Sequence, residues 1–202
     1  MSKELSIYLG QLGTISGKIE DILKTAYVGM MEEDKAKVKD AENQIIALKM
    51  SVKMLTSEML KNHDKFDAVK KEIMAPMSVI TQMDRMFESA NNFFSAINIK
   101  IQDRILFSDL ALSEVKEIFG IVCKIIQAMK DALNTKNPVL IDFIAKNSAV
   151  IAQKVEKSAE GHEKRLVEGL CQTRSSYVFL DILYAFKAIS WHAGEAMKKI
   201  TP

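Results

Sequence analysis

The sequence predicts an all-α protein of two tandem three-helix bundles, six long helices in total, and three observations support this fold class. Only 8 Gly and 3 Pro occur among 202 residues, and strand-rich proteins usually need more turn residues than this. Apolar residues recur at alternating steps of three and four, the period of helices packed side by side. The second half repeats the pattern of the first at an offset of about 103 to 105 residues, which indicates a duplicated unit.

The six helices are expected at these residues: 4–30, 33–61, 64–101, 110–134, 138–168 and 174–200. The first helix depends on composition, because Ala, Leu, Met, Lys and Glu are abundant and all rank high in helix propensity. The second has the apolar seam Val38, Ala41, Ile45, Leu48, Val52, Leu55 and Met59. The third has the seam Phe66, Val69, Ile73, Ile80, Met83, Phe87, Ala90, Phe94 and Ile97. The fourth has Val115, Ile118, Val122, Ile125, Met129 and Ala132. The sixth has Phe179, Ile182, Phe186, Ile189, Ala193, Ala196 and Ile200.

Local signals place the interruptions between these helices. Asn137 followed by Pro138 predicts the start of the fifth helix, since Asn caps a helix and Pro needs no hydrogen bond in its first turn. The stretch 169–176 separates the last two helices. Pro76 occupies one slot of the third seam, and we expect it to kink that helix or to split it near Ala75.

The two halves are expected to be repeats of residues 1–104 and 105–202, with the boundary at 103–109. Val38 in the first half corresponds to Phe143 in the second. Three amphipathic helices are about the minimum that buries a seam on every member, so each half is predicted to form one three-helix bundle.

Charge and cysteine content exclude several classes of protein. Lys and Arg total 28 and Asp and Glu total 26, and no basic run stands out, which argues against nucleic acid as the main partner. Cys123 and Cys171 lie far apart and form no metal motif, so we expect buried, reduced thiols. No apolar stretch approaches the roughly 18 residues that cross a bilayer. The chain is expected to be cytoplasmic, and it could be the soluble part of a membrane protein.

No motif for catalysis is present, and we expect that the protein is not an enzyme. The sequence lacks a nucleophile elbow, a P-loop, a dinucleotide fingerprint and a zinc-protease motif. No phosphate cradle is visible either, so direct phosphate binding is expected to be weak or absent. His162 is expected at the surface or at an interface.

One carboxylate pair could bind a metal. Asp84 and Glu88 are four residues apart, which puts both carboxylates on one face of a helix. Asn92 continues that face one turn later and could add a carbonyl oxygen. A hard or borderline cation is the usual way to hold two such carboxylates together. The alternative is a solvated acidic face, partly neutralised by Arg85 or by lysines of a neighbouring helix.

Methionine is concentrated in the first half. These residues are Met30, Met31, Met50, Met54, Met59, Met74, Met77, Met83 and Met86. Met fills irregular gaps in helical bundles and also forms adaptable binding surfaces, so both core packing and a binding groove are open interpretations.

Three segments together resemble the PhoU family of phosphate-transport regulators. In residues 29–55, a small-residue turn is followed by Val38, Glu42 and Ile45 in the family's order. The segment MDRMFESANNFF resembles the family signature Leu-Glu-Arg-Ile-Gly-Asp-x-Ala-x-Asn, and its matching positions are Asp84, Arg85, Glu88, Ala90 and Asn92.

The third segment, residues 162–197, is similar to the PhoU-like cytosolic region of bacterial sodium/phosphate cotransporters. Here the stretch Phe179 to Ile182 and the pair His192-Ala193 match the pattern. The second copy of the signature is degenerate, with Lys187 in the place of Glu, Trp191 in the place of Asp and Glu195 in the place of Asn.

The resemblance implies a fold, a role and a ligand. It implies two three-helix bundles and a regulatory role in phosphate transport, exerted by binding to a phosphate transporter or its signalling proteins, or as the cytosolic regulatory domain of a sodium/phosphate cotransporter. In either case the chain could be peripheral to an inner-membrane transporter or fused with one. It also implies iron or zinc at the first repeat, held by Asp84, Glu88 and Asn92. Lys187 suggests that the second repeat has lost its metal site, since a tethered ammonium can take the electrostatic place of a metal.

Two other functions stay open at the level of sequence. One is a metal-binding helical bundle that uses the acid-x-x-x-acid motif itself. The other is a generic helical scaffold that forms a homodimer through an exposed seam.

Overall fold

The computed structural model of the chain describes residues 3–63, 70–169 and 171–200. Within these ranges it contains only helices and their connections, which confirms the all-α prediction. The helices are α1 (Lys3–Glu32), α2 (Lys35–His63), α3 (Lys70–Gln102), α4 (Asp109–Thr135), α5 (Pro138–Val167) and α6 (Thr173–Lys198). The predicted start of the third helix at residue 64, and its seam residues Phe66 and Val69, lie outside the described residues.

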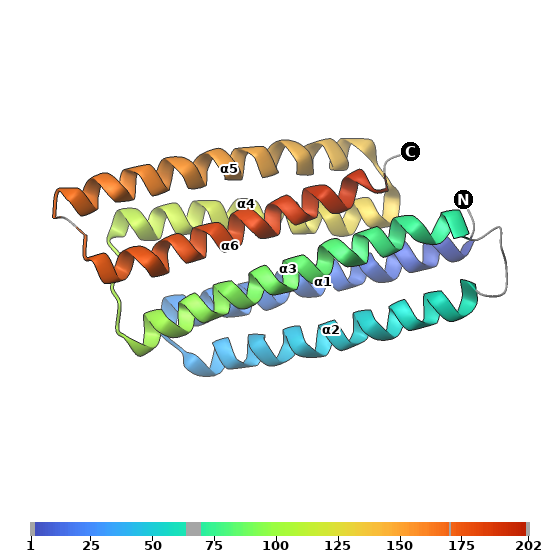
Figure 1. The fold of residues 1–202 in the computed structure, drawn as a ribbon, viewed down its shortest axis with the longest axis horizontal. Helices are drawn as coiled ribbons and strands as arrows, with labels where there is room; N and C mark the ends of the chain where they lie inside the picture. Colours follow the sequence, from blue (N-terminus) through green and yellow to red (C-terminus); the bar gives the residue numbers. More distant parts are fainter. Residues whose placement is uncertain (1–2, 64–69, 170, 201–202) are drawn as a thin grey trace.

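All six helices run lengthwise in one elongated bundle (Figure 1). Helices α2 and α5 lie at its two outer edges, with α1, α3, α4 and α6 between them. The two halves join where α1 packs on α4 and α3 packs on α6, and the α3–α6 contact is the most extensive in the molecule. One continuous core takes residues from all six helices. Each half also packs its own three helices together, while the division into two repeats at residue 104 stays a prediction.

The predicted seams are the core. Every described member of the four seams is buried, from Val38 in α2 to Ile200 after α6. Helix α3 continues unbroken on both sides of Pro76, so the alternative that this helix splits in two is wrong. Pro76 is the seventh residue of α3 and therefore lies inside the helix, where it removes one backbone hydrogen bond. The other alternative, a kink at this position, stays a prediction.

Helix α5 begins as the sequence predicts. The side chain of Asn137 accepts a hydrogen bond from the Val139 backbone N–H at 2.9 Å, and Pro138 occupies the first turn. On the other side of this turn, Lys136 adopts a left-handed conformation with φ 54° and ends α4. A cap, a proline and a left-handed residue therefore reverse the chain within a few residues.

Glycine lets α1 and α4 approach closely. A Cβ on Gly13 would lie 2.8 Å from the Asn134 side-chain nitrogen and 3.1 Å from the Lys130 carbonyl oxygen. One turn further along α1, the buried Ser16 hydroxyl donates to the Ile126 carbonyl at 3.2 Å. Both contacts require small side chains on α1, because a larger group at either position would push the helices apart.

Aromatic rings join the halves at the centre of the bundle. Phe186 of α6 lies 4.8 Å from Phe93 of α3 and 5.3 Å from Phe119 of α4, measured between ring centroids. Tyr27 of α1 stacks on Phe119 at 4.3 Å. Four helices thus share one aromatic cluster, which ties each half to the other.

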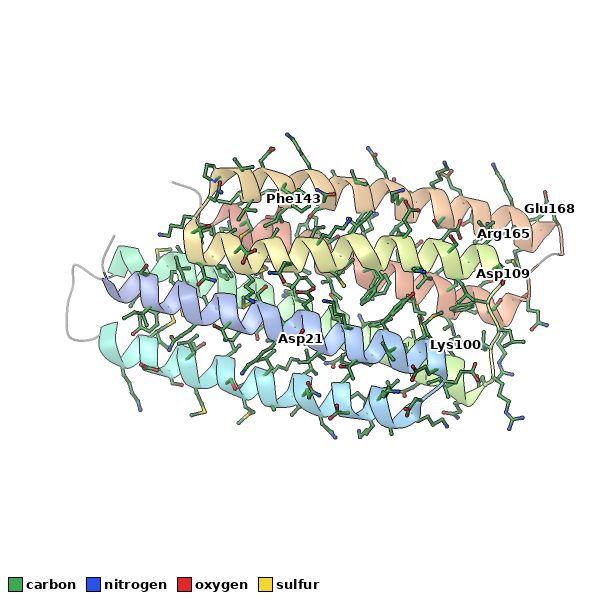
Figure 2. The ribbon with its side chains drawn as sticks, turned by 180° about the vertical axis from the view of Figure 1, so that it is seen from behind. Asp21, Lys100, Asp109, Phe143, Arg165 and Glu168 are labelled. Atoms are coloured by element: carbon green, nitrogen blue, oxygen red, sulfur yellow. The ribbon has the colours of Figure 1, made fainter. Side chains whose placement is uncertain are left out.

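A buried lysine closes one end of the molecule. Lys100 is 6% exposed, and its ammonium lies 3.0 Å from a carboxylate oxygen of Glu33 in the α1–α2 turn. The same ammonium lies 5.8 Å from the ring centroid of Phe107 in the α3–α4 connection. Figure 2 shows Lys100 at this end of the bundle. The pairing with Glu33 and the aromatic ring is what makes burial of this charge tolerable.

Candidate interaction surface on helices α3 and α6

The structure brings the two signature segments together. Helices α3 and α6 lie side by side (Figure 1), and they run antiparallel, since Gln82 lies opposite His192 while Phe93 lies opposite Phe186. His192 Nδ1 and Gln82 Oε1 are 2.9 Å apart. The two copies of the signature therefore share one face of the molecule.

The predicted metal-binding residues of α3 are exposed on this face. Glu88 pairs with Arg85 at 3.5 Å, and both side chains are 62% exposed. The pKa of the Asp84 carboxyl is raised, chiefly because neighbouring atoms shield it in part from water. The charge of Lys49 lowers this pKa, and the charge of Glu88 raises it. The two carboxylates interact as expected, but cations of α2 and of α3 itself already lie close to them.

A metal at this position would have few ligands. Among the described residues, no group of three or more His, Cys, Asp or Glu side chains is placed to hold a metal ion. Asp84 and Glu88 supply two carboxylates. Asn92, the third predicted ligand, lines a hollow between α3 and α6. The predicted metal site would therefore depend on the carboxylates of Asp84 and Glu88 alone.

The substituted residues of the second signature have other partners. The Lys187 ammonium lies 3.0 Å from a carboxylate oxygen of Glu156 on α5. Trp191 is 55% exposed and meets the His192 ring edge-on, with ring centroids 4.8 Å apart. Lys187 thus serves the α5–α6 contact, and Trp191 presents its ring to solvent.

The hollow between α3 and α6 has a volume of about 400 Å³. It is lined by Asn92, Ser95 and Ala96 of α3 and by Asp181, Tyr184, Ala185 and Ala188 of α6. Its polar groups are a carboxylate, an amide and two hydroxyls, and no cationic side chain lines it. Asp181 is exposed and makes no ion pair with another described residue.

Three aromatic side chains form a stripe along the exposed side of α6. Tyr177, Tyr184 and Trp191 are 69%, 50% and 55% exposed. They are seven residues apart, which is about two helical turns, and therefore share one face. Large exposed aromatics in a row are typical of surfaces that bind other proteins. We call this row the aromatic stripe.

His192 lies next to Trp191, at one end of the aromatic stripe, and its ring is neutral at neutral pH. Burial lowers the pKa of its imidazole, and the nearby Arg85 lowers it further, while Glu195 and Glu88 act in the opposite direction. A neutral ring keeps this part of the face free of an additional positive charge.

A second, larger hollow of about 770 Å³ lies between α1 and α2. Met50 and Met54 line it and are 55% and 72% exposed, whereas Met30, Met59 and Met83 are fully buried. The core-packing interpretation therefore holds for some of these methionines, while Met50 and Met54 line a surface hollow whose role in binding stays a prediction.

His162 does not lie at the surface, the first of its two expected places, but between α5 and α6. Its side chain is buried with 3% exposure, because Phe179 of α6 packs on the ring at 4.9 Å between centroids. Its Nε2 atom lies 2.7 Å from the Ser176 hydroxyl. Burial, and then Arg165, lower the pKa of this imidazole.

Both cysteines are free and partly buried rather than fully buried. Burial raises the pKa of the Cys123 thiol to about 11, and the carboxylate of Glu20 adds to this effect. Such a thiol is almost entirely protonated at neutral pH and is a poor nucleophile.

Sequence and fold comparisons add no relative. Among the described residues, no helix is both long enough and apolar enough to span a bilayer. No family model, no curated protein and no solved structure matches this chain.

Proposed function

We propose that this protein is a PhoU-like regulator of phosphate transport that acts by binding a partner protein through the face formed by α3 and α6. The observation that supports it most is the position of both signature segments on one exposed face, next to the aromatic stripe. Three large exposed rings beside an open hollow are more typical of a surface that binds a protein than of an enzyme's active-site cleft.

The partner would be a phosphate transporter or one of its signalling proteins. This part of the proposal comes from the three segments that resemble the family. It is independent of bound metal, since the aromatic stripe and the hollow contain no metal ligands other than Asp181 and Asn92.

Cross-linking in host cells tests the proposal. A tagged chain is cross-linked in cells grown with scarce and with abundant phosphate, and captured proteins are quantified by mass spectrometry against a tag-only control. Enrichment of a phosphate-transport protein or its sensor, changing with phosphate supply, is the expected result. If no such protein is enriched under either condition, the proposed role in phosphate transport is wrong.

Metal binding is the second candidate, and the observation in its favour is the position of the Asp84 and Glu88 carboxylates, since the charge of Glu88 raises the pKa of the Asp84 carboxyl. Elemental analysis of protein purified without chelator tests it, with the Asp84→Ala/Glu88→Ala double variant alongside. Iron or zinc in stoichiometric amount that is lost in the variant would establish the site. Equal metal content in both proteins would eliminate it.

A further inference from the structure

We infer that the hollow between α3 and α6 receives an Arg or Lys side chain from an amphipathic helix of the partner, and that this helix lies along the aromatic stripe. The inference deepens the proposed function and depends on its claim that the protein acts by binding a partner. It does not depend on the partner being a transport protein.

The chemistry of the hollow selects a cation. Asp181 supplies an exposed carboxylate that makes no ion pair with another described residue, and Tyr184 supplies an aromatic ring that is 50% exposed. A guanidinium or ammonium group is attracted both by a carboxylate and by the face of a ring. Asn92 and Ser95 can accept further hydrogen bonds through their side-chain oxygens. An anionic side chain in the hollow would repel the Asp181 carboxylate. A purely apolar side chain would remove water from that carboxylate without giving it a partner.

The spacing of the stripe selects a helix. Successive rings at Tyr177, Tyr184 and Trp191 are about 10 Å apart along the axis, since each residue of an α-helix rises about 1.5 Å. Two turns of a partner helix span the same distance, so residues at heptad spacing can pack against all three rings. Ile99 of α3, one helical turn beyond Ser95 of the hollow, is a further exposed apolar side chain, at 42%.

A second copy of this chain is the other candidate occupant. A twofold pairing centred on Tyr184 would run the two α6 helices antiparallel and place Asp181 of one copy opposite Lys187 of the other, but the Lys187 ammonium already lies 3.0 Å from a carboxylate oxygen of Glu156 in its own chain. The occupant we commit to is therefore a basic amphipathic helix of another protein, which brings a cation without such a partner, and a dimer is an outcome of the test.

The experiment uses the full chain and a displayed library of helix-forming peptides about 20 residues long with randomised surface positions. Selection on the wild-type protein is run beside selection on Asp181→Asn and Tyr184→Ala. Asp21→Asn is the matched control, because Asp21 is an exposed carboxylate of α1 on the opposite face of the bundle (Figure 2). All substituted side chains are exposed, and circular dichroism with a thermal melt verifies that each variant is folded.

The expected result has three parts. Enriched peptides carry Arg or Lys at one position within an apolar face, they bind Asp181→Asn and Tyr184→Ala at least tenfold more weakly than wild type, and they bind Asp21→Asn unchanged. Binding also alters the fluorescence of Trp191, the only tryptophan in the chain. Replacing the basic residue of the peptide by Ala should cost no further affinity in Asp181→Asn, since the two residues act on each other.

Several outcomes would overturn the inference. These are a library without binders, enriched peptides without a basic residue, equal binding to all variants, or a wild-type dimer that Tyr184→Ala dissociates. A failed peptide selection would not change the cross-linking to a phosphate-transport protein, and a missing cross-link would not change peptide binding. The two experiments therefore test the two proposals independently.

Discussion

At the scale of single residues, the sequence indicates the chemistry of each side chain but does not show which residues of other helices bury it. Asp84 and Glu88 lie on one exposed face, as their spacing predicts. Whether His162 lies at the surface or at an interface could not be decided from the sequence, because the residues that bury it, Ser176 and Phe179, belong to another helix. The aromatic stripe was missed because the sequence analysis followed the apolar residues of the buried seams, and exposed residues are not part of them. The one signal that could have revealed it was the seven-residue spacing of Tyr177, Tyr184 and Trp191.

The Cys123 thiol should react slowly with alkylating reagents. Its pKa of about 11, against an ordinary value of 9.0, leaves about a hundredfold less thiolate at pH 8 than an ordinary cysteine has. In a Cys171→Ala background, the iodoacetamide rate at Cys123 should rise about tenfold per pH unit to beyond pH 10. A rate that levels off near pH 9 would show that burial does not raise this pKa.

His162 should make the fold sensitive to acid. Its folded-state pKa lies below the ordinary 6.5, so the unfolded chain binds a proton more readily and stability falls as pH drops below about 6.5. The free energy of unfolding, measured by urea titration from pH 7.5 to 5.5, should fall less steeply in His162→Gln than in wild type. His192 has the same sign and should account for part of the decline that persists. Identical slopes in the two proteins would contradict this assignment.

At the scale of elements, the sequence predicted most of what the structure contains. The four seams are buried and the Asn137–Pro138 helix start is correct, because periodicity and capping are local properties. The pairing of α1 with α4 and of α3 with α6 could not be predicted, since periodicity shows which face is apolar and not which helix that face meets. Whether Pro76 splits α3 likewise depends on how the neighbouring helices pack around it.

Two glycines should respond oppositely to alanine. Gly13→Ala should lower the free energy of unfolding by about 1–3 kcal/mol, because the new methyl group overlaps α4. Gly120→Ala should raise it by about 0.5–1 kcal/mol, since nothing lies within 4 Å of that position and alanine favours a helix. Urea unfolding of both variants decides the matter. Stabilisation by Gly13→Ala would show that α1 and α4 do not need a close approach here.

At the scale of the whole molecule, the two halves share one core and should unfold as one unit. Phe186→Ala removes a ring that contacts both halves and should lower the free energy of unfolding by about 3–5 kcal/mol. Calorimetry should show a single transition for wild type and variant, with equal calorimetric and van't Hoff enthalpies. Two separate transitions would mean that the repeats fold independently.

The central claim is that the face formed by α3 and α6 carries a function in phosphate transport. The most direct test is phosphate uptake in host cells that lack the gene and receive wild type, Asp181→Lys/Tyr184→Lys or Asp21→Lys. Our account predicts altered uptake without the gene, restored by wild type and by Asp21→Lys, but not by the folded and equally abundant double variant. Equal restoration by all three proteins, or unchanged uptake without the gene, would contradict it.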